Sequence, residues 1–146
     1  EFYSRSAYAK ITTEELSALS YLKENSKEES VILTPPYDPD LALGGTIPSI
    51  WDWFDTAYVS AFSERRTYMD DYEQVDIMGY DYKPRLEIKR AIFTEVDPEI
   101  VKQKLLSTNG NYLYFPKATA PRVNLKTAGL TKVFENQGVE IWNIPF

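Results

Sequence analysis

Apolar and polar positions at the start of the chain follow first a helical and then a strand-like spacing. Leucines recur at helical intervals over residues 13–25, behind a Thr-Thr-Glu-Glu start that is typical of a helix N-terminus. Residues 30–34 form a short apolar run with β-branched members, and two prolines end it. The pattern therefore predicts a helix over residues 13–25, a charged link, and a buried strand over residues 30–34.

The middle of the chain has a less regular pattern. Residues 36–48 are rich in Pro, Gly and Asp, which predicts a loop. Residues 49–62 are aromatic and place apolar side chains at helical spacing, which predicts one helix. We expect a short strand over residues 66–69. Residues 70–84 are acidic, rich in tyrosine and without a clear period, so we expect a loop with local turns.

Two further helices and a strand are predicted in the second half. Residues 85–95 have helical periodicity, and Asp97 and Pro98 then provide the cap and first residue of a helix that runs to about Ser107. Residues 111–115 form an aromatic strand that ends at a proline. The side chains at helical spacing in the first of these helices are Leu86, Lys89, Ile92, Phe93 and Val96.

The last 17 positions, residues 130–146, predict a β-hairpin with its turn at Asn136-Gln137-Gly138, where the glycine is free to take positive φ. We expect Val139, Ile141 and Trp142 to close the core. Helices that alternate with short buried strands indicate an α/β fold: a mostly parallel or mixed sheet, flanked by helices and closed by the C-terminal antiparallel hairpin. The pattern does not indicate the strand order.

Composition narrows the function classes. The 146 residues suit a single domain over residues 1–146, and 22 acids against 16 bases argue against a nucleic-acid surface. The chain contains no cysteine and no histidine, so it cannot build a thiolate site, a Ser-His-Asp site or a histidine-based metal site. We expect no catalytic residue, no metal and no cofactor in this chain.

The beginning of the chain carries no apolar signal segment, and Glu1 is not an initiator. No run approaches the ~20 apolar residues that cross a bilayer. We therefore expect this domain to be the tail of a longer polypeptide.

Five segments carry a family resemblance. They are LSALSYLKENSKEESVILT, AFSERRTYM, PRLEIKRAIFTEVDPEIVKQKLL, NYLYFPK and LTKVFENQGVEIWNI. In their order they resemble the soluble C-terminal domain of polytopic prokaryotic glycosyltransferase-like membrane proteins of the dolichyl-phosphate-mannose-protein mannosyltransferase type. The group usually has a glycine just before the arginine of the second segment, where Glu64 stands here.

The resemblance implies a domain on the extracytoplasmic face of the cell membrane, with the transmembrane portion of the same polypeptide as its partner. In such transferases the catalytic acids lie in loops of the membrane portion. The parent chain would then be a glycosyltransferase, and no residue of this domain would inherit a catalytic role.

An aromatic and acidic cluster is the first candidate site. Trp51, Asp52, Trp53, Asp55 and Tyr58 combine flat rings with carboxylates, which is how clefts that bind glycans recognise sugar faces and hydroxyl groups. The alternative is an amphipathic helix whose rings fill the core and whose aspartates lie in its first turn.

Adjacent arginines are the second candidate. Arg65 and Arg66 could hold the phosphate of a lipid-linked sugar through paired guanidinium groups. Pairing with Glu64, Asp70 or Asp71 is the alternative, since acids are abundant nearby. The chain's other candidate arginines are Arg85, Arg90 and Arg122.

An acidic run, formed by Asp70, Asp71, Glu73, Asp76 and Asp81, has oxygen ligands of the kind that calcium prefers. The spacing of a calcium-binding EF-hand is absent, and acidic loops are commonly just solvated.

These observations lead to three alternative hypotheses for the function. The leading hypothesis is a non-catalytic accessory domain that covers or shapes the outward substrate entrance of a membrane-embedded glycosyltransferase, through the loops at residues 37–48 and 70–84. The alternative is a free-standing carbohydrate-binding module, which requires Trp51, Trp53 and Tyr58 to be exposed in one plane. A small hydrolase is the third, and it requires converging carboxylates with perturbed pKa values.

Overall fold

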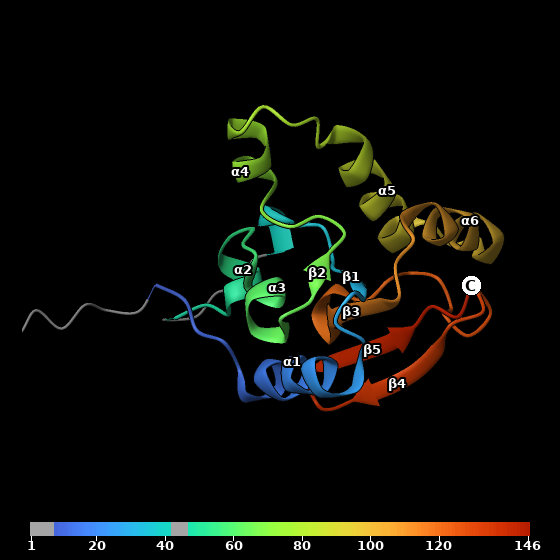
Figure 1. Ribbon diagram of the computed structural model, residues 1–146, viewed down its shortest axis with the longest axis horizontal. Helices are drawn as coiled ribbons and strands as arrows, with labels where there is room; N and C mark the ends of the chain where they lie inside the picture. Colours follow the sequence, from blue (N-terminus) through green and yellow to red (C-terminus); the bar gives the residue numbers. More distant parts are fainter. Residues whose placement is uncertain (1–7, 42–46) are drawn as a thin grey trace, which may run out of the picture.

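The computed structural model, which describes residues 8–41 and 47–146, contains a five-stranded mixed sheet with helices on both faces (Figure 1). This is the predicted α/β fold. The elements are α1 (Thr13–Asn25), β1 (Val31–Leu33), η1 (Pro39–Leu41), α2 (Ile50–Trp53), α3 (Tyr58–Ser63), β2 (Arg66–Thr67), α4 (Tyr72–Ile77), α5 (Lys83–Thr94), α6 (Pro98–Thr108), β3 (Tyr112–Pro116), η2 (Lys117–Thr119), β4 (Thr131–Glu135) and β5 (Val139–Asn143).

The strand order is β2-β1-β3-β5-β4. β1 lies between β2 and β3 and is parallel to both, whereas β3 pairs antiparallel with β5 and β5 with β4. The chain passes from β1 outward to β2 and then crosses back to the other side of β1 to form β3. The connections therefore reverse direction between β1 and β3, which makes this a topological switch point.

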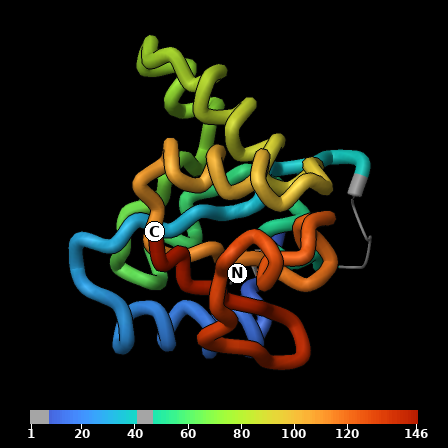
Figure 2. The backbone as a smooth tube through the Cα atoms, turned by 90° about the vertical axis from the view of Figure 1, so that its right-hand side faces the viewer, coloured from blue at the N-terminus to red at the C-terminus, as the bar shows by residue number. Residues whose placement is uncertain are grey.

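Successive side chains of each strand enter opposite layers of the core. Ile32, Tyr114 and Ile141 pack against α1 and α3 on one face. Leu33, Leu113 and Trp142 pack against α5 and α6 on the other face. Figure 2 shows the two helical layers with the sheet between them. The buried positions of Val139, Ile141 and Trp142 confirm that the last strand closes the core.

Helix α1 has the predicted bounds because its start is encoded locally. The Thr12 hydroxyl accepts from the backbone N–H of Glu15, and the Glu15 carboxylate accepts from the backbone N–H of Thr12, which completes a capping box. The helix ends at Asn25, and the backbone of the next residue, Ser26, is extended.

Two predictions for the middle of the chain were wrong. Residues 49–62 form two short helices, α2 and α3, instead of one, because the extended backbone at Phe54 interrupts them. Asp55 then accepts a hydrogen bond from the backbone N–H of Tyr72 at 2.9 Å, which ties this break to the start of α4. Helix α4 itself lies in the segment predicted to be a loop, and Asp71 caps it.

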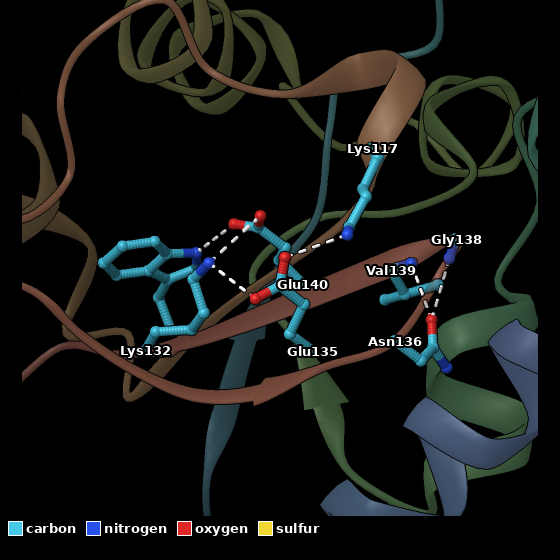
Figure 3. A network of polar contacts seen from close by, with 8 residues as sticks. Lys117, Lys132, Glu135, Asn136, Gly138, Val139 and Glu140 are labelled. Atoms are coloured by element: carbon cyan, nitrogen blue, oxygen red, sulfur yellow. Dashed lines mark hydrogen bonds and ion pairs between the residues drawn. The ribbon is translucent and has the colours of Figure 1, made fainter.

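The C-terminal antiparallel hairpin is confirmed, but its turn is made differently from the prediction. Gly138 is not among the described glycines with positive φ, which are Gly79 and Gly129. Instead, Asn136 Oδ1 accepts from the backbone N–H groups of Gly138, at 3.0 Å, and Val139, at 2.9 Å (Figure 3). Position 138 favours glycine because a Cβ there would lie only 3.0 Å from the Cβ of Glu14.

Charged side chains link the strands of the hairpin on its outer surface (Figure 3). Glu135 pairs with Lys117 and Lys132, each at 2.9 Å, and Lys132 also pairs with Glu140 at 3.3 Å. The register of β4 against β5 shifts between Lys132 and Phe134, which marks a bulge in the outermost strand.

We expect Asn136→Ala to lower the free energy of unfolding by about 1–2 kcal/mol, because it removes both turn hydrogen bonds and a third from its amide to the Glu14 carbonyl. Urea denaturation measures the change. Gln137→Ala, at the exposed neighbouring position, is the control and should stay within about 0.5 kcal/mol of the wild type. Equal losses in both variants would contradict the role given to Asn136.

Candidate functional site

A cavity of ≈ 220 Å³ opens where the three parallel strands end. One wall is the segment after β1, from Thr34 to Asp38, and Asp70, which follows β2, lies beside it. The end of β3 and η2 close a second side. In open α/β sheets, ligands bind outside the carboxyl ends of the strands, at the switch point. The cavity has that position. Its remaining walls come from the α2–α3 segment and from Phe93, Thr94 and Arg122.

Beside the cavity lies a buried polar cluster of three side chains. Asp70 Oδ1 accepts a 2.5 Å hydrogen bond from the Thr34 hydroxyl and lies 3.7 Å from Lys89 Nζ. Lys89 also donates to Thr34 Oγ1 at 3.1 Å and to the Met69 carbonyl at 2.6 Å. The side chains of Lys89 and Asp70 are only 2% and 6% exposed. The ammonium group of Lys89, on α5, thus links the segment that follows β1 to the segment that follows β2.

Burial dominates the acid–base properties of this pair. It raises the pKa of Asp70 from 3.8 to about 6, although Lys89, Thr34 and Thr67 act in the opposite direction. Nearby Asp55 raises the pKa of Asp70 further. Burial likewise lowers the pKa of Lys89, despite the favourable charge of Asp70.

We expect the Asp70 carboxyl group to make the protein less stable as pH rises from 3.8 to about 6. In this window the unfolded chain has released its proton while the folded chain still binds it, so the free energy of unfolding falls, by on the order of 2–3 kcal/mol. Urea denaturation across this pH range, compared with Asp70→Asn, isolates the contribution. Parallel pH profiles for the two proteins would contradict it.

Two oxygens around the cavity lack a hydrogen bond within the part of the chain that the structure describes. They are Asp70 Oδ2 and Thr56 Oγ1, and both are buried. Both residues line the cavity. Native structures leave few buried polar atoms unpaired, so these two atoms indicate where a bound group would make contacts.

The aromatic and acidic cluster predicted from the sequence is divided by the fold. Trp51, Asp55 and Tyr58 line the cavity. Asp52 is buried, whereas Trp53 is 44% exposed and its ring stacks on that of Tyr8 at a centroid distance of 6.3 Å. Tyr58 is only 9% exposed, so Trp51, Trp53 and Tyr58 do not form one exposed plane. Ligand binding by this set of residues stays a prediction.

The two adjacent arginines lie away from the cavity. Arg65 donates to the carbonyls of Lys23 and Ser26, at 2.7 and 2.9 Å, and to the Ser26 hydroxyl, so it binds the C-terminal end of α1. Glu64 pairs with Lys23. Arg66 is exposed and shares a shallow hollow with Glu28 and Glu29. Phosphate binding at this pair stays a prediction, and the guanidinium group of Arg65 already has a structural role.

The acidic run is dispersed as well. Asp70 points into the buried cluster, Asp71 caps α4, and Glu73, Asp76 and Asp81 are exposed. Within residues 8–41 and 47–146, no three acidic side chains converge in a way that could hold a metal ion.

Sequence reasoning missed Thr34, Thr56 and Lys89 as site residues. A signal existed for Lys89, because a lysine interrupts the apolar stripe of α5 between Leu86 and Ile92 and therefore has to be buried with a partner. Thr34 and Asp70 each follow a short strand, and the ends of neighbouring parallel strands meet at one edge. No comparable signal points to Thr56.

Comparison with known proteins yields a likeness of fold alone. No protein-family model matches the chain, and a search of curated proteins finds no significant sequence match. Among solved structures, the C-terminal globular domain of the oligosaccharyltransferase AfAglB-S2 from Archaeoglobus fulgidus is similar, with a TM-score of 0.56 and 9% sequence identity. The similarity covers 93% of this chain and 99% of that domain.

Proposed function

We propose that this chain is an accessory domain on the extracytoplasmic face of a membrane-embedded glycosyltransferase, and that it has no complete active site of its own. The observation that carries the proposal is the shared fold, which spans nearly the whole of both chains and in the neighbour belongs to an oligosaccharyltransferase. No helix in residues 8–41 and 47–146 is long and apolar enough to cross a bilayer.

Two features of the structure suit a domain that shapes a substrate entrance. The loops proposed for this task leave the ends of β1 and β2 beside the cavity, although residues 42–46 of the first loop lie outside the described residues. The second segment, with α4 and the start of α5, stands out from the body as an arm (Figure 1). At its tip Ile77, Met78 and Tyr80 are exposed, which suits contact with the transmembrane portion of the same polypeptide.

The full-length gene product tests the proposal. We expect it to carry membrane-spanning segments and to transfer sugar in isolated membranes. Replacing Ile77 and Met78 together with serine should lower the transfer rate, because it removes the apolar arm tip. Val96→Ser with Ile100→Ser, which removes other exposed apolar side chains, is the matched control and should retain the rate. A full-length product without apolar spans would refute the proposal.

A further inference from the structure

The two unpaired oxygens at the cavity, Asp70 Oδ2 and Thr56 Oγ1, need different hydrogen-bond partners. Thr34 donates to Oδ1 of Asp70 and Lys89 pairs with the same oxygen, while Thr67 also interacts favourably with the ionised carboxyl group. Oδ2 therefore has free acceptor capacity within the described chain. The Thr56 hydroxyl, also unpaired there, can both donate and accept. A group that satisfies both atoms must offer at least one donor and tolerate a hydroxyl neighbour.

The charge at the cavity favours a neutral ligand. The negative charge of Asp70 is already matched by the buried ammonium group of Lys89, so Oδ2 needs a hydrogen-bond donor and no further counter-charge. Asp55, which is half-buried, also lines the cavity and disfavours an anion. Arg122 at the edge of the cavity is exposed to solvent, where its charge is screened.

The size of the cavity and the chemistry of its walls restrict the class of ligand further. A cavity of ≈ 220 Å³ is far larger than the roughly 10–15 Å³ that holds one water, and smaller than the ~300–1,000 Å³ of pockets for drug-sized ligands. Tyr37, Trp51 and Phe54 contribute aromatic side chains to the lining, and the Tyr37 hydroxyl donates to the Trp53 carbonyl at 3.3 Å. Flat apolar walls with a few buried polar atoms suit a six-membered ring that has apolar faces and hydroxyl edges.

We propose that this cavity binds one pyranose ring of a neutral sugar, with Asp70 Oδ2 accepting from one ring hydroxyl and Thr56 Oγ1 bonded to a neighbouring one. Trp51 and Phe54 pack on the ring faces. The inference that a sugar binds depends only on the cavity. Whether that sugar belongs to the donor or to the acceptor of a transferase is a question that rests on the proposed function.

Titration of the 146-residue chain with single sugars, followed by amide chemical shifts, tests the inference. We expect neutral hexoses such as glucose, mannose and galactose to shift the amides of residues 34, 37, 38, 51–58 and 70. Glucuronic acid and glucosamine, which carry opposite charges on the same ring, should bind more weakly than glucose. Tighter binding of either charged sugar would overturn the assignment of a neutral ligand.

Two variants examine the contacts. Asp70→Asn presents an NH₂ donor or a weaker acceptor in place of the carboxylate oxygen and should weaken binding about tenfold or more. Thr56→Val removes the hydroxyl at constant shape and should weaken binding about three- to tenfold. Thr131→Val is the control: Thr131 is exposed on β4 and does not line the cavity, so binding should not change.

The outcomes separate this inference from the proposed function. No response to any neutral sugar, or a response that Asp70→Asn and Thr56→Val leave unchanged, overturns the binding site while the transfer assay on the full-length protein can still succeed. If Asp70→Asn fails to fold, the effect of Thr56→Val on sugar binding alone decides whether the site is correct. Sugar binding by the isolated chain, together with a full-length product that lacks membrane spans, would retain the site and refute the accessory role.

Discussion

Lys89→Met lowers the free energy of unfolding by about 3–5 kcal/mol at neutral pH, because it leaves Asp70 buried without its counter-charge. The substitution keeps the apolar length of the side chain but removes the donor to Thr34 and to the Met69 carbonyl. The loss should shrink below the pKa of Asp70, where the carboxyl group is neutral. Urea denaturation at neutral and acidic pH measures both effects.

Two further variants make the Lys89 prediction specific. Lys23→Met breaks an exposed ion pair with Glu64 and should cost less than about 1 kcal/mol. The double variant Asp70→Asn/Lys89→Met removes both charges, so it should be more stable than Lys89→Met alone. A double variant less stable than the single one would show that hydrogen bonding, and not the unpaired charge, dominates at this site.

Arg65→Ala is expected to lower the free energy of unfolding by about 2–3 kcal/mol, because the guanidinium group binds two carbonyls at the end of α1 and so joins this helix to the turn after α3. Arg65→Lys should recover less than half of the loss, since an ammonium group cannot reproduce the planar fork that also reaches the Ser26 hydroxyl. Urea denaturation is the measurement.

The neighbouring arginine provides the control for Arg65. Arg66→Lys and Arg66→Ala change an exposed side chain and should each stay within about 0.5 kcal/mol of the wild type. If Arg65→Lys were as stable as the wild type, charge alone would explain the role of Arg65, and its hydrogen-bonding geometry would be irrelevant.

Elements with local signals were predictable from the sequence. The capping residues Thr12 and Glu15 define where α1 begins, and Asp97 with Pro98 does the same for α6. The closing hairpin was recognisable because its alternating strands flank a short polar turn. In each case the residues that decide the structure lie within a few positions of one another.

Features that depend on distant contacts were not predictable. The break between α2 and α3 is tied to the hydrogen bond between Asp55 and the backbone N–H of Tyr72, 17 positions later. The cavity needs Thr34, Thr56 and Asp70 to meet, which follows from the strand order β2-β1-β3. Periodicity indicates which residues are buried but not which strands are neighbours, so the candidate site emerged only from the fold.

Both edge strands of the sheet have features that oppose pairing with a strand of another chain. β2 is only two residues long, and β4 at the opposite margin carries the bulge after Lys132 together with charged side chains. A long, flat and apolar edge strand would allow another copy to add a strand and start an aggregate. Short edge strands, bulges and lysines prevent this strand addition. The domain should therefore stay monodisperse even at high protein concentration.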